Sequence, residues 1–281
     1  MMAEWVGWSN GSWLPVSNMC IPLDDLGHLQ SAVVVERMRT VGGKLLDWDE
    51  HWSRFETGCK FLGIVANDRA MDLGEIAREL VEEKLLGLAD FSLVLLATPG
   101  SVRRPETPTW MIYPQPIPWR KLHDLYSQGE NLVVARCSNV PANCWPPQLK
   151  TRARLQYYLA DHEAQEICRA HDLVGQASGL LLNDAGAITE TSTANVGFVI
   201  ADRLVVPEMD SILHGISLLR TLRLAEACGI PVTHHPVTVE EAIEASEILC
   251  MGTTGCLWHA KSLRLGEDFQ EWSLPQAESM T

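Results

Sequence analysis

The sequence lacks the features that mark membrane-spanning and secreted chains. Its 281 residues contain no run of about eighteen uncharged apolar residues, the minimum that a membrane-spanning helix needs. The first residues also lack the basic segment and apolar stretch of a signal peptide, since Glu4, Ser9 and Asn10 stand there. We therefore expect a soluble, cytoplasmic protein that does not contact a membrane.

Positive charge is scarce. The chain has 22 Lys and Arg against 36 Asp and Glu, which gives a formal net charge of -14. Because nucleic-acid binding needs a basic face, we expect no nucleic-acid partner. An anionic ligand would need a few cations gathered at one place.

Paired cysteine and metal-ligand motifs are also missing. The eight cysteines include no C-x-x-C pair and no zinc-like spacing, so we expect reduced thiols and neither disulfides nor a structural metal. Adjacent His234 and His235 point to different sides of an extended chain and have no acidic or cysteine ligand at a useful spacing. We predict no metal site.

What the sequence does contain is enough apolar material, 46% of residues, for two modest domains. Pro114, Pro116 and Pro118 are predicted to interrupt regular structure and to mark the domain boundary. We therefore divide the chain into an N-terminal α/β domain over 1–118, an interdomain linker over 119–130 and a C-terminal domain over 131–281.

The first half shows strand and helix patterns in alternation. The predicted elements are a hairpin within 1–22, a strand over 31–40 that turns through Gly42-Gly43 into 44–48, a helix from Asp49 to Gly63, a helix over 72–86, and strands over 91–98 and 109–113.

The second half predicts a mixed or antiparallel sheet with helices. The predicted elements are strands over 131–136, 180–182, 188–189, 196–200, 204–206 and 248–251, helices over 151–170, 216–228 and 240–245, and a polar tail after Glu267.

Three features of this half suit the chemistry of pyridoxal 5'-phosphate. Lys150 stands after Pro146-Pro147 at the start of the helix predicted over 151–170, where partial enclosure would favour a nucleophilic amine. Glu190 could hold the pyridine nitrogen protonated. The helix opening at Ile216 and Ser217 offers free N–H groups to a phosphate. Taken singly, these residues are equally compatible with an exposed lysine, a solvent-facing carboxylate and an ordinary helix.

The succession of motifs resembles the class IV aminotransferases, the fold type IV pyridoxal-phosphate enzymes. The resemblance runs from about Ile21 to Lys261, and its order and spacing carry it. The matching pieces are Glu36-Arg37-Met38-Arg39, Gly43-Lys44-Leu45, His51-Trp52-Ser53-Arg54-Phe55, Leu149-Lys150-Thr151, Asp184-Ala185-Gly186-Ala187-Ile188-Thr189-Glu190, Asn195, Leu213-His214-Gly215-Ile216-Ser217 and Gly252-Thr253-Thr254.

The resemblance implies an α/β (α+β) fold of two domains, like that of D-amino acid aminotransferases, with pyridoxal 5'-phosphate bound in the C-terminal domain. It implies Lys150 and Glu190 as catalytic residues, with Lys150 bound to the cofactor as a Schiff base. It also implies a site at a subunit interface, and hence a homodimer. The implied cofactor contacts are Arg54, Lys150, Glu190, Asn195, Ile216, Ser217, Thr253 and Thr254, and the substrate contacts are Glu36, Arg39, Arg103, Arg104, Trp145 and Thr254. Without the resemblance, His51 and Arg54 would be interpreted as solvent-exposed residues that form a surface ion pair with an acidic group.

The expected activity is transfer of an amino group between an apolar or branched-chain amino acid and a 2-oxo acid. Three departures leave alternatives open. Leu155 replaces the branched-chain enzymes' tyrosine, Thr98-Pro99-Gly100 lacks the arginine of the T-R-G motif, and Leu29-Gln30-Ser31-Ala32 replaces F-G-D-G. One alternative is a lyase that releases pyruvate from aminodeoxychorismate. Another is a cofactor-free binding protein with the same fold.

Overall fold

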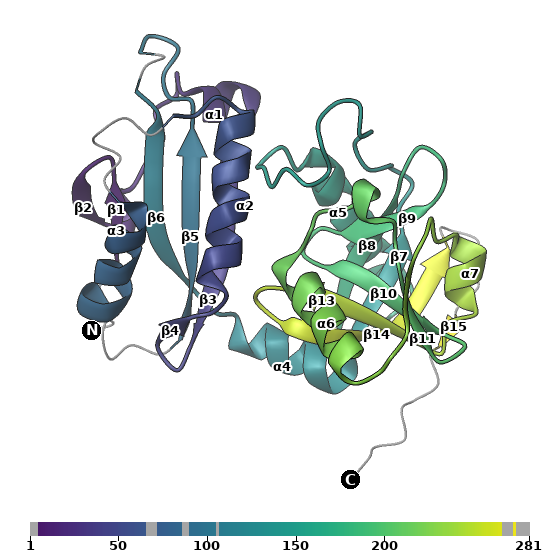
Figure 1. Cartoon of the computed structure of the whole chain (residues 1–281). Helices are drawn as coiled ribbons and strands as arrows, with labels where there is room; N and C mark the ends of the chain where they lie inside the picture. Colours follow the sequence, from purple (N-terminus) through teal and green to yellow (C-terminus); the bar gives the residue numbers. More distant parts are fainter. Residues whose placement is uncertain (1–4, 66–71, 86–89, 105–106, 266–271, 274–281) are drawn as a thin grey trace. The chain divides into compact units, whose positions relative to one another are not determined.

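The computed structural model describes residues 5–65, 72–85, 90–104, 107–265 and 272–273. The chain divides into two compact units, drawn in Figure 1. Unit 1 comprises residues 1–117 and 149–153, and unit 2 comprises residues 118–148 and 154–281. Within the described residues, no helix is both long and apolar enough to cross a membrane.

Unit 1 is built on a six-stranded antiparallel sheet in the order β2-β1-β6-β5-β3-β4 (Figure 1). Its elements are β1 (Val6–Ser9), β2 (Ser12–Pro15), a 3-10 turn (Val16–Asn18), α1 (Leu26–Gln30), β3 (Val34–Val41), β4 (Lys44–Leu45), α2 (Trp48–Phe61), α3 (Leu73–Glu79), a π-helical turn (Leu80–Lys84), β5 (Phe91–Thr98) and β6 (Thr109–Pro116).

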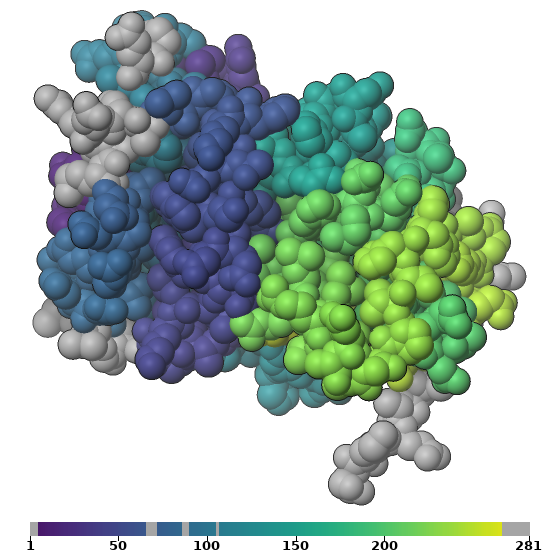
Figure 2. All heavy atoms as spheres, in the orientation of Figure 1, coloured from purple at the N-terminus to yellow at the C-terminus, as the bar shows by residue number. Residues whose placement is uncertain are grey.

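The two faces of this sheet are covered differently. Alternation along β3 sends Val34 and Met38 to the face where Phe55 of α2 and Ile76 of α3 complete the main core. Side chains of α2 form much of the visible surface of unit 1 in Figure 2. Val33 belongs to a smaller cluster with Leu96 and Met111. The apolar run predicted as a buried strand is confirmed, since every residue of β5 is buried.

The predicted N-cap of the helix that ends near Gly63 is wrong. Asp49 is the predicted cap, but α2 begins at Trp48 with Asp47 at the N-cap position. Trp48 stacks on Trp52 one turn later, with ring centroids 5.7 Å apart, so its packing favours the earlier start. Asp49 instead lies in the first turn, where its negative charge complements the helix dipole.

The prediction that regular structure is interrupted from Pro114 onward is wrong. Strand β6 continues to Pro116, opposite Phe91 of β5. The pairing between β1 and β6 is confined to Ile112 and Met111, so Pro114 and Pro116 lie beyond it. A proline is compatible with a strand where its nitrogen has no ladder partner. The segment 119–130, predicted as a linker, carries α4 (Trp119–Gln128) and the start of β7.

Unit 2 contains a nine-stranded sheet with both parallel and antiparallel pairs. The unit therefore has the mixed sheet, the first of the two predicted alternatives. Its elements are α4 (Trp119–Gln128), β7 (Glu130–Val134), α5 (Leu155–Ala170), β8 (Gln176–Leu182), β9 (Ile188–Thr191), β10 (Asn195–Ile200), β11 (Arg203–Val206), a 3-10 turn (Met209–Ser211), α6 (Ile216–Ala227), β12 (Val232–His234), α7 (Val239–Ile243), β13 (Glu247–Gly252), β14 (Cys256–Leu265) and β15 (Trp272–Ser273).

Part of this sheet closes on itself. The strands follow the order β12-β11-β10-β13-β14-β7-β8-β9, and β9 pairs back with β10 through Glu190 and Asn195. The closing pair of strands, β9 and β10, meets at two of the predicted site residues. The fold therefore places Glu190 and Asn195 directly opposite each other.

The predicted start of the 151–170 helix is also wrong, because α5 begins at Leu155. Residues just after Lys150 are extended instead. Thr151 forms a bridge with Val34 of β3, and the Arg152 N–H donates to the Val33 carbonyl. These backbone bonds to a strand compete with the first helical turn and prevail. The C-terminal end predicted for the 72–86 helix, like most of the predicted polar tail, lies outside the described residues.

Candidate active site

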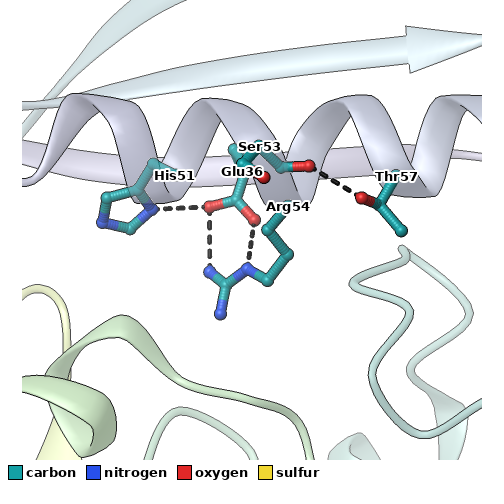
Figure 3. A network of polar contacts seen from close by, with 5 residues as sticks. All are labelled: Glu36, His51, Ser53, Arg54 and Thr57. Carbon is teal, nitrogen blue, oxygen red and sulfur yellow. Dashed lines mark hydrogen bonds and ion pairs between the residues drawn. The ribbon is translucent and has the colours of Figure 1, made fainter.

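The predicted site residues fall into one set in each unit. In unit 1 the central group is the Glu36 carboxylate, buried on β3 (0% exposed). Figure 3 shows His51 and Arg54 of α2 turned toward it. Arg54 makes a two-nitrogen contact, Nε to Oε1 at 2.7 Å and Nη2 to Oε2 at 2.9 Å, while His51 Nδ1 lies 2.7 Å from Oε2. The spacing of three between His51 and Arg54 puts both on one helix face, and that face is turned to the sheet.

The electrostatics of this cluster favour an ionised Glu36. Burial alone would raise the pKa of Glu36, but the charge of Arg54 and the hydrogen bonds from His51 and Arg54 outweigh burial and lower it to about 2. The cluster is thus an internal ion pair, and the interpretation of Arg54 and His51 as a surface pair is wrong. Glu36, predicted as a substrate contact, orients the Arg54 guanidinium in this structure.

Lys150 also belongs to unit 1, and its backbone is held by β3. The Val35 N–H donates to the Lys150 carbonyl at 3.1 Å, and Thr151 pairs with Val34. A Cβ built on Gly58 of α2 would lie 2.8 Å from Val34 and 3.3 Å from Leu149, so α2 packs closely on this segment. The lysine predicted to bind the cofactor is therefore carried by an extended segment that is bonded to β3. Its backbone partner, Val35, immediately precedes Glu36.

In unit 2 the central group is the Glu190 carboxylate, 6% exposed at the end of β9. Tyr157 donates its hydroxyl to Oε1 at 2.6 Å. The Asn195 amide donates to Oε2 at 3.0 Å and the Leu213 backbone N–H donates to the same oxygen at 3.1 Å. These three donors are neutral groups that stabilise a carboxylate without cancelling its charge.

Asn195 also joins Glu190 to the start of α6. It donates to the Leu213 carbonyl at 2.9 Å, and a Cβ added to Gly215 would stand 2.0 Å from its Oδ1. Only glycine fits there, at the N-cap of α6, where no described side chain caps the helix. Backbone N–H groups of Ile216 and Ser217 thus begin a twelve-residue helix, the arrangement that suits an anion.

The Gly252-Thr253-Thr254-Gly255 turn connects β13 to β14 and is held closely by its neighbours. A Cβ on Gly252 would lie 2.5 Å from the Thr193 carbonyl oxygen and 3.1 Å from the Trp258 ring. Trp258 is itself fixed by its indole N–H, which donates to the buried Glu130 at 2.7 Å. The two predicted threonines therefore stand on a rigid turn beside the residues that follow Glu190.

Sequence reasoning missed Tyr157 and Trp258. Tyr157 lies seven residues after Lys150 on the first turns of α5, and Trp258 follows the Thr-Thr pair by four. The sequence carries no local signal for either role, since an aromatic side chain at helical or strand spacing is most often part of a core. Only their polar atoms distinguish them, and those contacts are tertiary.

The other predicted substrate residues are dispersed over the two units. Arg39 is buried on β3 and donates from Nε to the Thr40 carbonyl at 3.3 Å. Arg103 and Arg104 are exposed, and Arg103 Nε lies 3.7 Å from Asp24. Trp145 is half-buried in the loop after β7.

The residues present fit pyridoxal 5'-phosphate. A buried carboxylate held by neutral donors suits a protonated ring nitrogen, and the glycine-only N-cap of α6 with its amide groups suits a phosphate. In unit 1, Lys150 carries an amine of the kind that a Schiff base needs, and the Arg54 guanidinium is oriented by Glu36.

Comparison with known proteins agrees with this chemistry. The family model described as amino-transferase class IV matches residues 33–263. A probable branched-chain-amino-acid aminotransferase of Rickettsia bellii is 24% identical over 264 residues, covering 93% of this chain and 88% of its own. A D-alanine aminotransferase of Staphylococcus aureus is 24% identical, covering 87% of this chain and 84% of its own.

The fold is shared with solved structures as well. A branched-chain amino acid aminotransferase from Escherichia coli superposes with a TM-score of 0.77 at 21% identity, covering 94% of this chain and 88% of that chain. This likeness confirms the predicted two-domain, mixed helix and strand class. Together with the family model, which spans most of the sequence, it shows that the chain belongs to the class IV aminotransferases and is a pyridoxal-phosphate-dependent aminotransferase of amino acids and 2-oxo acids.

Proposed function

We propose that Lys150 and Glu190 are the catalytic residues of this aminotransferase. When bound, pyridoxal phosphate supplies an aldehyde for the amine and a ring that accepts electrons from the substrate Cα. Lys150 Nζ would condense with that aldehyde and, once displaced by the amino acid, would move the proton at Cα. Glu190 would hold the ring nitrogen protonated. The observation that carries this proposal is the set of neutral donors around the Glu190 carboxylate.

The lysine assignment has a direct test. Borohydride reduction of the purified holoprotein followed by peptide mass spectrometry should find the cofactor on Lys150. The matched sites are the other five lysines, Lys44, Lys60, Lys84, Lys121 and Lys261. An adduct on any of these instead of Lys150 would refute the assignment, and a Lys150→Ala variant should fold but form no adduct.

We further propose that the phosphate is held by Arg54, by the N–H groups of Ile216 and Ser217, and by Thr253. Support comes from the uncapped start of α6 and from the rigid turn that carries Thr253. The backbone N–H of Thr254 would meet the substrate carboxylate, and Asn195 would keep Glu190 and α6 aligned.

For the substrate, we propose an amino acid with an apolar side chain, of the branched-chain or a similar class. The names of the relatives, branched-chain and D-alanine aminotransferases, concern apolar substrates. In this chain Thr98 is fully buried and donates to Asp25 at 2.9 Å, and the position after it is Pro99, which carries no charge to trap a second carboxylate. Trp145 could add an apolar wall.

A panel of amino donors tests the substrate proposal. Mixed with the holoprotein without an acceptor, apolar donors should bleach the visible absorption of the bound cofactor faster than aspartate or glutamate. A 2-oxo acid should restore it. Preference for aspartate or glutamate would overturn the proposal and would direct attention to exposed Arg103 and Arg104.

A homodimer is also proposed. Three large apolar side chains on the first turns of α5, Leu155, Tyr158 and Leu159, are 69%, 66% and 48% exposed. An exposed apolar cluster of this kind commonly marks an interface. Sedimentation equilibrium should give twice the chain mass, and a Leu155→Glu, Leu159→Glu variant should sediment as a monomer. A monomeric wild type would refute the proposal.

We propose a reducing compartment, the cytoplasm, for the protein. All eight cysteines are free thiols, and Cys20, Cys144, Cys228 and Cys256 are exposed. Exposed unpaired thiols are typical of reducing surroundings. Fractionation of cells that express the chain would test this.

A further inference from the structure

Tyr157 makes a contact that the proposed mechanism does not use. Its hydroxyl donates to Glu190 Oε1 at 2.6 Å, a short hydrogen bond between a phenol and a carboxylate. The two residues come from different elements of unit 2, the first turns of α5 and the end of β9. A hydrogen bond to an ionised acceptor is stronger than one between neutral groups and draws electron density from the oxygen.

The ring of Tyr157 is fixed independently of its hydroxyl. It packs against a buried cluster of Ala135, Ala160 and Leu181. On its other side the Arg154 guanidinium lies 4.5 Å from the ring centroid, and Arg154 also donates to the Ser192 carbonyl beside Glu190. Removing the hydroxyl alone should therefore leave the ring and the start of α5 in place.

The ionisable groups packed around the phenol keep it protonated. Burial and the negative charge of Glu190 raise the pKa of Tyr157 well above its ordinary value, against the opposing effect of Arg154. Cys137, which packs on the same cluster, has a pKa raised by burial and by Glu163, so it adds no charge near neutral pH. Tyr157 is thus a hydrogen-bond donor across the working range of an enzyme.

We propose that Tyr157 is a positioning residue that withdraws negative charge from Glu190 and so weakens the field this carboxylate exerts on the cofactor ring. The inference rests on the proposed role of Glu190. The carboxylate holds the ring nitrogen protonated, and the phenol limits how strongly it does so. Tyr157 acts through Glu190 and touches no reacting atom.

The test is the pH titration of the visible absorption of the bound cofactor in the holoprotein. In Tyr157→Phe, more negative charge remains on Glu190, which favours the protonated form of the chromophore, so the midpoint should move to higher pH by about half a unit. In Glu190→Gln the carboxylate charge and the ring-nitrogen proton that it holds are lost together, so the midpoint should move by more than in Tyr157→Phe. The double variant should match Glu190→Gln, because Tyr157 acts through that carboxylate.

The rate of proton abstraction separates this role from simple loosening. If Tyr157 only held Glu190 in place, Tyr157→Phe would release the ring-nitrogen proton and slow proton abstraction, as Glu190→Gln does, whereas the proposed role leaves the ring protonated and the rate undiminished. Tyr113→Phe is the matched control, since Tyr113 lies on β6 of unit 1 and packs against the Val33 cluster, and it should titrate as wild type. A wild-type or lowered midpoint in Tyr157→Phe, with a shift in Glu190→Gln, overturns the Tyr157 proposal alone. A wild-type midpoint in Glu190→Gln overturns the role of Glu190 itself.

The hydrogen bond can also be measured without cofactor. The ultraviolet titration of the apoprotein should show one of the four tyrosines ionising late, and Tyr157→Phe should remove that late component. In Glu190→Gln it should ionise earlier, since the carboxylate charge that opposes a phenolate is gone. An unchanged titration in Glu190→Gln would show that the two groups are not coupled and would refute the proposal.

Discussion

Units 1 and 2 each bury a glutamate within the matched family region, but they hold it with different chemistry. Glu36 is held by the guanidinium of Arg54 and the imidazole of His51. Glu190 receives hydrogen bonds from a phenol, a side-chain amide and a backbone N–H. Burial of an ion is costly without such partners, so both arrangements stabilise the carboxylate, the first through charged donors and the second through three neutral ones.

The difference assigns the two carboxylates to different tasks. A carboxylate bound to Arg54 has its charge matched within the protein, so its contribution is to orient the arginine. Under the proposed function, Glu190 faces a protonated pyridine ring, a cation whose charge the three neutral donors do not replace. Exchanging or removing the donors should therefore affect catalysis in unit 2 and mainly affinity and stability in unit 1.

The largest expected effect is in unit 2. Glu190→Gln should bind the cofactor but slow proton abstraction by about a thousandfold, because a neutral amide no longer holds the ring nitrogen protonated. Stopped-flow absorbance with one amino acid measures this rate. Glu163→Gln is the control, since Glu163 pairs with Arg136 and is not among the three donors that hold Glu190. A wild-type rate in Glu190→Gln would refute the catalytic role of Glu190 and leave only a structural difference between the two glutamates.

Arg54→Ala should have the next largest effect, now on affinity. Losing a guanidinium contact to the phosphate should weaken cofactor binding by about ten- to a thousandfold. Equilibrium dialysis of the apoprotein with pyridoxal phosphate measures it. Arg136→Ala, which breaks an arginine–glutamate pair with 73% of the arginine side chain exposed, should bind normally. Equal affinity in wild type and Arg54→Ala would leave Arg54 as a structural partner of Glu36 only.

Acid should expose the charge pairing of Glu36. Its pKa is about 2 in the folded protein, against an ordinary value of 4.5, so its stabilising contribution is complete above pH 4.5 and is lost as the pH falls toward 2. The full shift corresponds to about 3 kcal/mol. Urea unfolding at several pH values should show this loss, and Glu36→Gln should flatten the curve across that window. A Glu36→Gln curve as steep as wild type would assign the acid sensitivity to other carboxylates.

The smallest expected effect is that of Ser217→Ala. The backbone N–H groups at the start of α6 remain in this variant, so cofactor affinity should fall less than about tenfold. The same dialysis measures it. A loss as large as that of Arg54→Ala would mean that the Ser217 hydroxyl, and not the helix terminus, dominates phosphate binding.

Several elements followed from the sequence because the information is local. The continuous apolar run over 91–98 predicted β5, Gly229 and Pro231 after the apolar stripe limited α6, and the Asn183-Gly186 turn separated β8 from β9. Motif order was equally informative, since Lys150, Glu190 and the start of α6 stand at spacings that resemble the family, and the family model confirms the membership.

The helix after Lys150 shows where local reading fails. Thr151 and Arg152 have a compatible helical pattern, yet they pair with Val34 and Val33, more than a hundred residues earlier. Strand β6 continues through Pro114 because β5 pairs with it there while β1 does not, and this too is a long-range arrangement. Such choices rest on long-range hydrogen bonds that no sequence window contains.

What the sequence by itself determined is the family, the order of its elements and the residues able to do the chemistry. The tertiary structure alone decided how those residues are used. Nothing in the spacing of Glu36 and Arg54 shows that they bind each other, and nothing in that of Tyr157 and Glu190 shows a 2.6 Å hydrogen bond. The physical reason is that the charge state and direction of a buried side chain depend on the groups packed around it, and folding brings those groups from distant parts of the chain.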